Sequence, residues 1–232
     1  MNMQKIGGAY MSDCRCLVLD HDDTVVRSEE TVNFPAFRAV LKRLRPETPI
    51  TLEEFSAQCF HLGFFGMCSE VYGFTQEEQE IQLAYWTDYV RTHIPPPYEG
   101  IRPVLERFRA EGGLICVSSH SGVENITRDY RKHFGFVPDR IFGWEIGEDR
   151  KKPSPYALDQ IMSAYRLEPR QLLVVDDMKP GFDMARSRNV PFACAGWSHH
   201  DPQIAAYMRS RCKVYLNTPQ ELEKLLFETE NT

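Results

Sequence analysis

The 232-residue sequence has no apolar run approaching the roughly 20 residues that a membrane-spanning helix requires. It also lacks a block of clustered lysines and arginines, and its formal net charge is -6. Because nucleic-acid-binding proteins present a clustered positive surface, we expect neither a membrane protein nor a nucleic-acid-binding protein. The opening residues, MNMQKIGGAYMSD, contain no apolar central segment, so we expect no secretory signal peptide.

The seven cysteines show no spacing typical of a zinc site or a disulfide framework. They are Cys14, Cys16, Cys59, Cys68, Cys116, Cys194 and Cys212. Most lie in apolar stretches, where cysteine behaves as a small hydrophobic residue. We therefore expect reduced thiols and a cytoplasmic protein.

Short apolar runs, by contrast, are frequent, and they are typical of strands buried on both faces. They span 16–20 (CLVLD), 114–119 (LICVSS), 172–177 (LLVVDD), 192–196 (FACAG) and 213–216 (KVYL). Helical patterns lie between or after the later runs, at 100–113, 121–135, 154–167, 180–189 and 218–227. This alternation predicts an α/β fold in which helices cover both faces of a parallel sheet.

The segment 31–97 interrupts this alternation, because it contains no strand-like run. Helical patterns cover 34–44, 51–60 and 76–93, and IPPPYEG (94–100) is typical of a stiff linker. We therefore predict a core formed by residues 13–30 and 98–232, and an all-helical domain formed by residues 31–97.

Polar residues follow three of the predicted strands. They form the motifs DHDDT (20–24), SSHS (118–121) and DD (176–177), and a fourth motif, KKP (151–153), precedes a helix. In open parallel sheets, ligands bind beyond the carboxyl ends of the strands. Carboxylates, hydroxyls and a lysine together suit a magnesium ion and a phosphoryl group.

These four motifs, in this order, resemble those of the haloacid dehalogenase (HAD) superfamily. The resemblance is to the phosphatase branch with a helical cap of the C1 type after the first strand, which includes phosphoglycolate phosphatases and beta-phosphoglucomutases. It implies a Rossmann-like core and a cap over residues 31–97. It also implies a magnesium-dependent enzyme that hydrolyses a small phosphomonoester through an aspartyl-phosphate intermediate.

The resemblance assigns the catalytic and metal-binding roles to four aspartates. Asp20 would be the nucleophile, and Asp22 would be the general acid and base. Asp177 would be the main metal ligand, with Asp176 as a second ligand, and Asp20 and the backbone carbonyl of Asp22 would complete the set. Because all these ligands are oxygens, we expect Mg²⁺.

Phosphate binding would fall to Thr24, Ser118 and Lys152, with Ser119 as the runner-up to Ser118. Lys152 directly precedes a proline, as the family's lysine does. We expect the neighbouring Lys151 to be solvated. His120 matches no functional position of the family, and we expect it to face solvent.

Asp23 is a departure from the family, which usually has glycine at this position. Glycine tolerates unusual backbone angles, and aspartate is among the better substitutes for it. We favour a role for Asp23 in the turn over added negative charge near the metal.

The predicted cap carries more acidic than basic residues. Between 33 and 97 the basic residues are Arg38, Lys42, Arg43, Arg45 and Arg91, and the acidic ones are Glu47, Glu53, Glu54, Glu70, Glu77, Glu78, Glu80 and Asp88. The stretch CFHLGFFGMCSEVYGF (59–74) either forms the core of the cap or faces the substrate. If it faces the substrate, it favours a neutral or apolar distal group over a second phosphate.

Two alternatives to a phosphatase stay open. One is a sugar phosphomutase of the beta-phosphoglucomutase type, and the other is a binding or regulatory protein on a HAD scaffold. Dehalogenase and phosphonatase activities are disfavoured, because those relatives do not have a carboxylate at the position of Asp22. We expect a monomer or a homodimer acting on a small phosphorylated metabolite.

Overall fold

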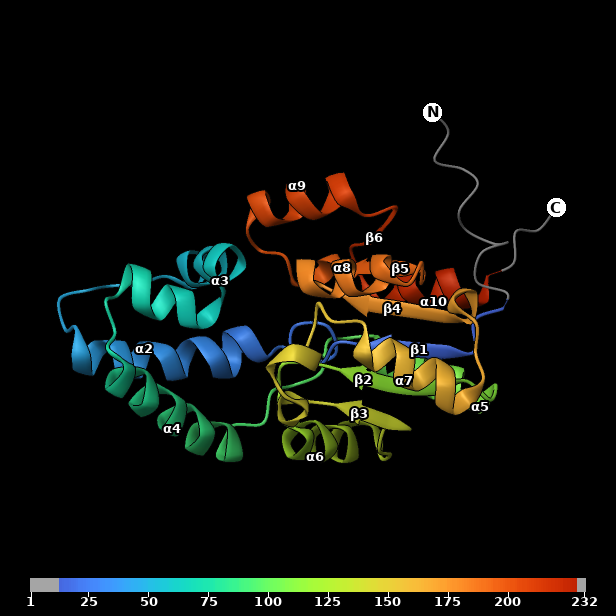
Figure 1. The fold of residues 1–232 in the computed structure, drawn as a ribbon, viewed down its shortest axis with the longest axis horizontal. Helices are drawn as coiled ribbons and strands as arrows, with labels where there is room; N and C mark the ends of the chain where they lie inside the picture. Colours follow the sequence, from blue (N-terminus) through green and yellow to red (C-terminus); the bar gives the residue numbers. More distant parts are fainter. Residues whose placement is uncertain (1–12, 229–232) are drawn as a thin grey trace.

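Six parallel strands form one sheet in the order β3-β2-β1-β4-β5-β6 (Figure 1). This computed structural model describes residues 13–228 of the chain. The strands are β1 (Cys16–Leu19), β2 (Leu114–Ser118), β3 (Arg140–Phe142), β4 (Leu172–Asp176), β5 (Phe192–Ala195) and β6 (Val214–Leu216). The five predicted strands are confirmed. β3 is not predicted, because its three residues, RIF, carry too short an apolar pattern.

The helices of the core connect and cover these strands. They are α5 (Ile101–Ala110), α6 (Val123–Phe134), α7 (Tyr156–Tyr165), α8 (Lys179–Ser187), α9 (Pro202–Arg211) and α10 (Pro219–Phe227). α10 begins at the Thr218 side chain, which accepts a hydrogen bond from the Glu221 amide. α9 is not predicted, although Asp201 accepts a hydrogen bond from the Gln203 amide and Pro202 opens the helix.

Successive residues of the central strand belong to different layers of the core. Leu17 and Leu19 of β1 pack with side chains of α5, α6 and α10, whereas Cys16 and Val18 pack with α7 and α8. All four are fully buried. A parallel strand that is covered on both faces must be apolar throughout, which explains the uninterrupted apolar runs in the sequence.

The segment between β1 and α5 is all helical and has its own apolar core. It contains α2 (Phe34–Leu44), α3 (Leu52–Gly66) and α4 (Gln76–Thr92), with π-helical turns at Glu29–Asn33 and Met67–Val71. Capping boxes of Thr51 with Glu54 and of Thr75 with Glu78 define the starts of α3 and α4. We call this segment the helical insertion (29–92). It lies beside the carboxyl ends of the strands (Figure 1).

Residues 59–74 lie mainly in the apolar core of the helical insertion, which is one of the two roles that the sequence leaves open. Most of their aromatic and sulfur-containing side chains pack inside the helical insertion, namely Cys59, Phe64, Met67, Cys68, Tyr72 and Phe74. Phe60 instead contacts Tyr207 of α9, with ring centroids 5.3 Å apart, and Phe65 lies 6.2 Å from Trp144 in the core. Gly63, with a φ of 70°, kinks α3 between these two phenylalanines.

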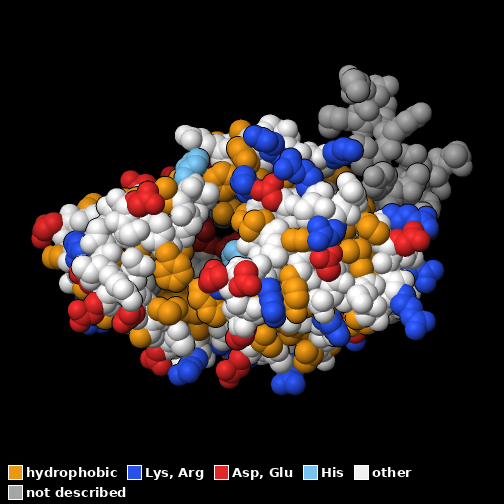
Figure 2. All heavy atoms as spheres, viewed as in Figure 1, with side chains coloured by type: hydrophobic (Ala, Val, Ile, Leu, Met, Phe, Trp, Pro, Cys, Tyr) orange, Lys and Arg blue, Asp and Glu red, His pale blue; other side chains and the backbone are white. Residues whose placement is uncertain are grey.

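A hollow separates the helical insertion from the core, and acidic and histidine side chains are visible inside it (Figure 2).

All seven cysteines lie in the described part of the chain and are free thiols. Of the helices in residues 13–228, none is long and apolar enough to cross a membrane. The opening residues, in which we expect no signal peptide, lie almost entirely outside the described part.

Candidate active site

Asp20 is the first residue after β1, at the centre of the sheet. Its amide donates a 2.9 Å hydrogen bond to the Val175 carbonyl, which continues the pairing of β1 with β4 by one residue. The chain then turns sharply, because the His21 carbonyl accepts hydrogen bonds from the amides of Val25 and Val26. The carboxylate of Asp20 is therefore fixed at the carboxyl edge of the sheet, where it is 8% exposed.

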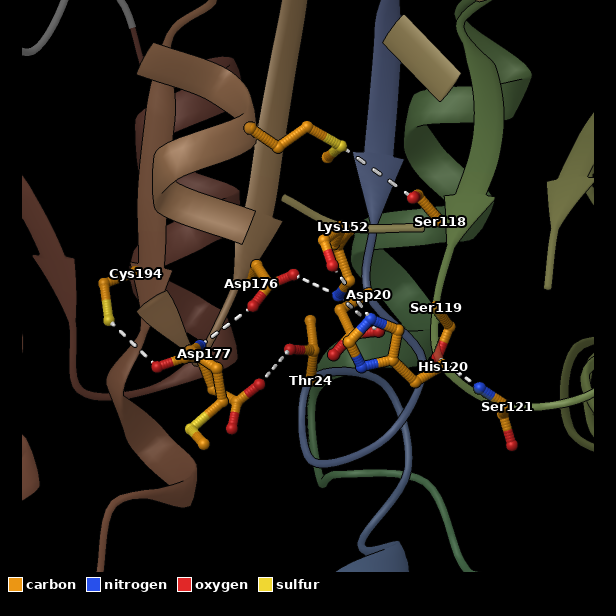
Figure 3. Close-up of polar contacts among 12 residues, drawn as sticks. Asp20, Thr24, Ser118, Ser119, His120, Ser121, Lys152, Asp176, Asp177 and Cys194 are labelled. Atoms are coloured by element: carbon orange, nitrogen blue, oxygen red, sulfur yellow. Dashed lines mark hydrogen bonds and ion pairs between the residues drawn. The ribbon is translucent and has the colours of Figure 1, made fainter. Parts of the chain in front are cut away.

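Three carboxylates meet at this edge (Figure 3). Asp20, Asp176 and Asp177 each place an oxygen within 4.8 Å of the others, and all three are buried. Nζ of Lys152 lies 3.0 Å from Oδ1 of Asp20 and 2.5 Å from Oδ2 of Asp176. Residues from three distant parts of the sequence thus form one charged cluster, which we call the carboxylate cluster (Asp20, Lys152, Asp176 and Asp177).

The charges in the carboxylate cluster do not balance. Burial raises the pKa of Asp176 to about 6 despite the opposing effect of Lys152, and it raises the pKa of Asp177 well above its usual value. Burial alone would lower the pKa of Lys152, but Asp176 and Asp20 outweigh it and raise that pKa. One ammonium group faces three carboxylates, so an additional cation would stabilise the ionised site.

The donor set of the cluster fits Mg²⁺. The converging atoms of Asp20, Asp176 and Asp177 are all carboxylate oxygens, which are the ligands that Mg²⁺ prefers. Oδ1 of Asp176 also accepts a 2.8 Å hydrogen bond from the Met178 amide, which orients this carboxylate. Asp22 lies two residues after Asp20 on the same loop, is half-buried, and forms a backbone bridge to Val26.

Gly181 allows α8 to approach the cluster closely. A Cβ atom at this position would lie 2.2 Å from Cγ of Asp176, which is far inside van der Waals contact. Glycine is therefore required here by the contact with the Asp176 side chain.

The predicted phosphate-binding residues surround the cluster at different distances. Oγ1 of Thr24 donates a 3.3 Å hydrogen bond to Oδ1 of Asp177. The hydroxyl oxygen of Ser119 accepts a hydrogen bond from the Ser121 amide, which tightens the loop after β2. The Ser118 hydroxyl instead lies 3.9 Å from the sulfur of Met184 and is turned away from Asp20 (Figure 3).

The side chains of His120 and Lys151 make more contacts with other residues than the sequence predicts. The prediction that Lys151 is solvated is wrong: this side chain is buried, forms an ion pair with Glu148, and lies 3.3 Å from the Trp144 ring centroid. His120 is exposed, but its Nε2 atom lies 3.2 Å from the Lys152 carbonyl. Since a carbonyl only accepts, Nε2 carries the proton and Nδ1 is an acceptor whenever the ring is neutral. Desolvation, together with Lys152, lowers the pKa of His120, which favours the neutral ring.

Two supporting residues after β5 were not identified in the sequence. Nε1 of Trp197 donates a 3.1 Å hydrogen bond to the Thr24 carbonyl, and Nε2 of His199 donates a 2.7 Å hydrogen bond to the Asp177 carbonyl. They hold two loops of the site in place. The signal available in the sequence was their position, GWSHH, directly after a predicted parallel strand.

Comparisons with known proteins agree with this architecture. CbbY from Rhodobacter sphaeroides, in complex with xylulose-1,5-bisphosphate, aligns with a TM-score of 0.69 and 15% identity, covering 91% of this chain and 99% of that one. A predicted phosphoglycolate phosphatase from Haemophilus somnus gives a TM-score of 0.73 and 15% identity, with 92% and 98% coverage. A predicted phosphatase from Clostridium acetobutylicum gives 0.70 and 17%, with 91% and 97% coverage. At these identities the likeness shows the fold.

No curated protein gives a significant sequence match. The family model described as haloacid dehalogenase-like hydrolase matches residues 14–187, which include every member of the carboxylate cluster. The chain therefore belongs to the haloacid dehalogenase-like hydrolase family.

Proposed function

We propose that this enzyme is a magnesium-dependent phosphatase that hydrolyses a small phosphomonoester through an aspartyl-phosphate on Asp20. The observation that carries the proposal is the convergence of Asp20, Lys152, Asp176 and Asp177 at the carboxyl edge of the sheet. The buried carboxylate of Asp20 is placed to attack a phosphoryl group. The ammonium group and the further carboxylates are suited to hold that phosphoryl group and a divalent cation bound to it.

In the proposed mechanism, Asp20 attacks the phosphorus atom, and Asp22 protonates the departing oxygen of the substrate. Asp22 then takes a proton from the water molecule that hydrolyses the aspartyl-phosphate. Lys152 neutralises Asp20 and the phosphoryl oxygens, and Thr24 and Ser119 contribute hydroxyl donors. Ser118 would contribute its hydroxyl only after that group turns from Met184 toward Asp20. Mg²⁺, held by Asp20, Asp176, Asp177 and the Asp22 carbonyl, would supply further neutralisation of negative charge.

We also propose that residues 31–97 act as a cap that selects the substrate. Phe60 and Phe65 of α3 contact the core at Tyr207 and Trp144, which supports a position of this helix over the opening of the site. The proposed boundaries agree with the hydrogen bond from the Tyr98 amide to the Val25 carbonyl, where the chain returns to the core.

A single phosphate is the most suitable anionic group for a substrate of this site. A small pocket of about 20 Å³ lies where the helical insertion meets the core, and the described residues that line it include no lysine or arginine. Its ionisable lining residues are Asp23, Glu29, Asp177, His199, His200 and Asp201. The pocket has room for about one water molecule, and its acidic lining beside Asp177 disfavours a second phosphate or a carboxylate close to it.

The proposal is tested by phosphate release from p-nitrophenyl phosphate and from a panel of phosphomonoesters, with Mg²⁺ and with EDTA. We expect turnover with Mg²⁺, little turnover with EDTA, and none for Asp20→Asn, whose fold is checked by circular dichroism. Turnover by Asp20→Asn comparable to that of the unmodified protein would contradict the mechanism.

The same panel separates the alternatives. Isomer formation from a sugar phosphate, without net phosphate release, would identify a phosphomutase. No turnover of any substrate by the unmodified protein would favour a binding or regulatory role.

We also propose that the enzyme works in the cytoplasm. Its seven cysteines are free thiols, which is typical of proteins in a reducing compartment.

A further inference from the structure

Asp23 occupies the backbone conformation for which the family uses glycine. Its φ is 53°, in the left-handed region, and its amide donates a 2.8 Å hydrogen bond to the Val26 carbonyl. Aspartate tolerates this region better than most residues that have a Cβ atom. Backbone geometry alone would therefore be satisfied by glycine, and it does not explain the carboxylate.

The Asp23 carboxylate contacts both segments that join the helical insertion to the core. Oδ2 accepts a 2.9 Å hydrogen bond from the Glu29 amide and a 3.5 Å hydrogen bond from the Ser28 hydroxyl, where the insertion begins. Oδ1 accepts a 3.3 Å hydrogen bond from the Tyr98 hydroxyl, where the chain returns. One side chain of the catalytic loop is thus bonded to both segments.

The two segments are also paired with each other. Val26 and Pro97 form an antiparallel bridge, and the Arg27 amide donates to the Pro96 carbonyl at 2.9 Å. The loop 20–26, which carries Asp20 and Asp22, leads directly into the first segment. A change in the angle between insertion and core must therefore pass through residues in contact with Asp23.

We propose that Asp23 is a positioning residue that couples the placement of the helical insertion to that of the loop carrying Asp20 and Asp22. This inference rests on the proposed function for its catalytic consequence. Without the carboxylate, the Glu29 amide at the start of a helical turn and the Tyr98 hydroxyl lose their acceptor. The loop then retains its backbone conformation but loses its side-chain attachment to both segments.

The test compares Asp23→Gly with Asp23→Asn. Glycine keeps the left-handed backbone and removes both contacts, whereas asparagine tolerates the same backbone and keeps an oxygen and an amide in their place. Both variants remove the negative charge. A difference in kcat between them therefore reports the loss of the hydrogen bonds from residue 23 to the two segments. Tyr98→Phe removes one contact and leaves Asp23 intact.

For Asp23→Gly we expect a loss of roughly tenfold in kcat for p-nitrophenyl phosphate with little change in KM, since small displacements of reacting groups lower kcat strongly. Asp23→Asn should stay within about twofold of the unmodified enzyme, and Tyr98→Phe should lie between them. Hydrogen exchange of the amides in residues 27–29 should be faster in Asp23→Gly alone.

Two outcomes would overturn the inference. One is faster exchange in Asp23→Gly without any change in kcat, which would make Asp23 a structural contact only. The other is an equal loss of kcat in Asp23→Gly and Asp23→Asn, which would assign the effect to charge.

If the unmodified protein hydrolyses no phosphoester, the proposed function fails. Calorimetric Mg²⁺ binding then tests the coupling, and equal affinities of Asp23→Gly and Asp23→Asn would overturn it.

Discussion

Nζ of Lys152 lies 3.0 Å from Oδ1 of Asp20, and the same ammonium group contacts Asp176. These contacts join the proposed nucleophile to a proposed metal ligand through one buried cation. Lys152 is 8% exposed, so solvent screens the interaction only weakly.

Replacing Lys152 with methionine should lower kcat for p-nitrophenyl phosphate by roughly 10²–10³-fold, as removal of a preorganised electrostatic contact does. Lys151→Met is the matched control, since Lys151 contacts Trp144 and Glu148. Equal losses in the two variants would contradict a specific role for Lys152.

Replacing Gly181 with alanine should weaken Mg²⁺ binding by roughly 10–100-fold, the range seen when the support of a metal ligand is disturbed. The added Cβ atom would overlap the Asp176 carboxylate and displace it. Titration calorimetry measures the affinity. Arg186→Ala on the same helix is the control, because that side chain is 69% exposed, and an unchanged affinity in both variants would argue against Asp176 as a ligand.

Removing Asp129 should destabilise the protein strongly, because its buried carboxylate is the partner of the buried His21 ring. Nε2 of His21 lies 3.1 Å from Oδ2 of Asp129, the two side chains are 1% and 2% exposed, and Arg128 contacts the other carboxylate oxygen at 2.7 Å. Asp129→Ala leaves buried partners unpaired and should lower the free energy of unfolding by about 3–5 kcal/mol.

Urea denaturation measures this loss. Asp183→Ala is the control, because Asp183 forms a partly exposed pair with Lys179 and should cost less than about 1 kcal/mol. A loss for Asp129→Ala no larger than that of the control would show that the buried pair contributes little.

Replacing Glu29 with glutamine should stabilise the protein at neutral pH. Burial raises the pKa of Glu29 above its ordinary value of 4.5, and Ser56 donates a hydrogen bond to its carboxylate. Below pH 4.5 the folded and unfolded states both bind the proton, so the residue has no effect there. As the pH rises, the unfolded state ionises first, and stability falls until the folded-state pKa is passed.

Thermal unfolding of the unmodified protein and of Glu29→Gln should therefore give similar Tm values at pH 4 and a higher Tm for the variant at pH 8. The expected difference is roughly 2–4 °C for each kcal/mol removed. Glu53→Gln, at an exposed position near the start of α3, provides the control. A Tm difference that does not change with pH would rule out burial of the charge as its cause.

The sequence was sufficient to predict the central strands and to identify the four motifs, because apolar runs and short motifs are local signals. Consecutive apolar residues such as Leu17 and Val18 are required by burial on both faces, and acids after strands converge wherever parallel strands end together. Asp20, Asp176 and Asp177 meet as a result, although more than 150 residues separate the first from the last two.

Features that depend on tertiary contacts were not predictable in this way. β3 is too short to have a pattern of its own, and the burial of Lys151 depends on how the connection between β3 and α7 folds the Trp144 ring against it. The orientation of the Ser118 hydroxyl toward Met184 depends on which helix covers β2. Sequence periodicity describes which face a residue occupies, and it carries no information on which distant side chain it meets.

The bridge between Val26 and Pro97 means that the helical insertion leaves and re-enters the core at neighbouring points. The ends of a segment of about seventy residues are therefore close enough for a short turn to join them, and neither β1 nor α5 would need to move. Evolution can lengthen, shorten or exchange such a segment without rebuilding the sheet. If the helical insertion selects the substrate as proposed, recognition can thus diverge while the residues at the strand ends stay unchanged.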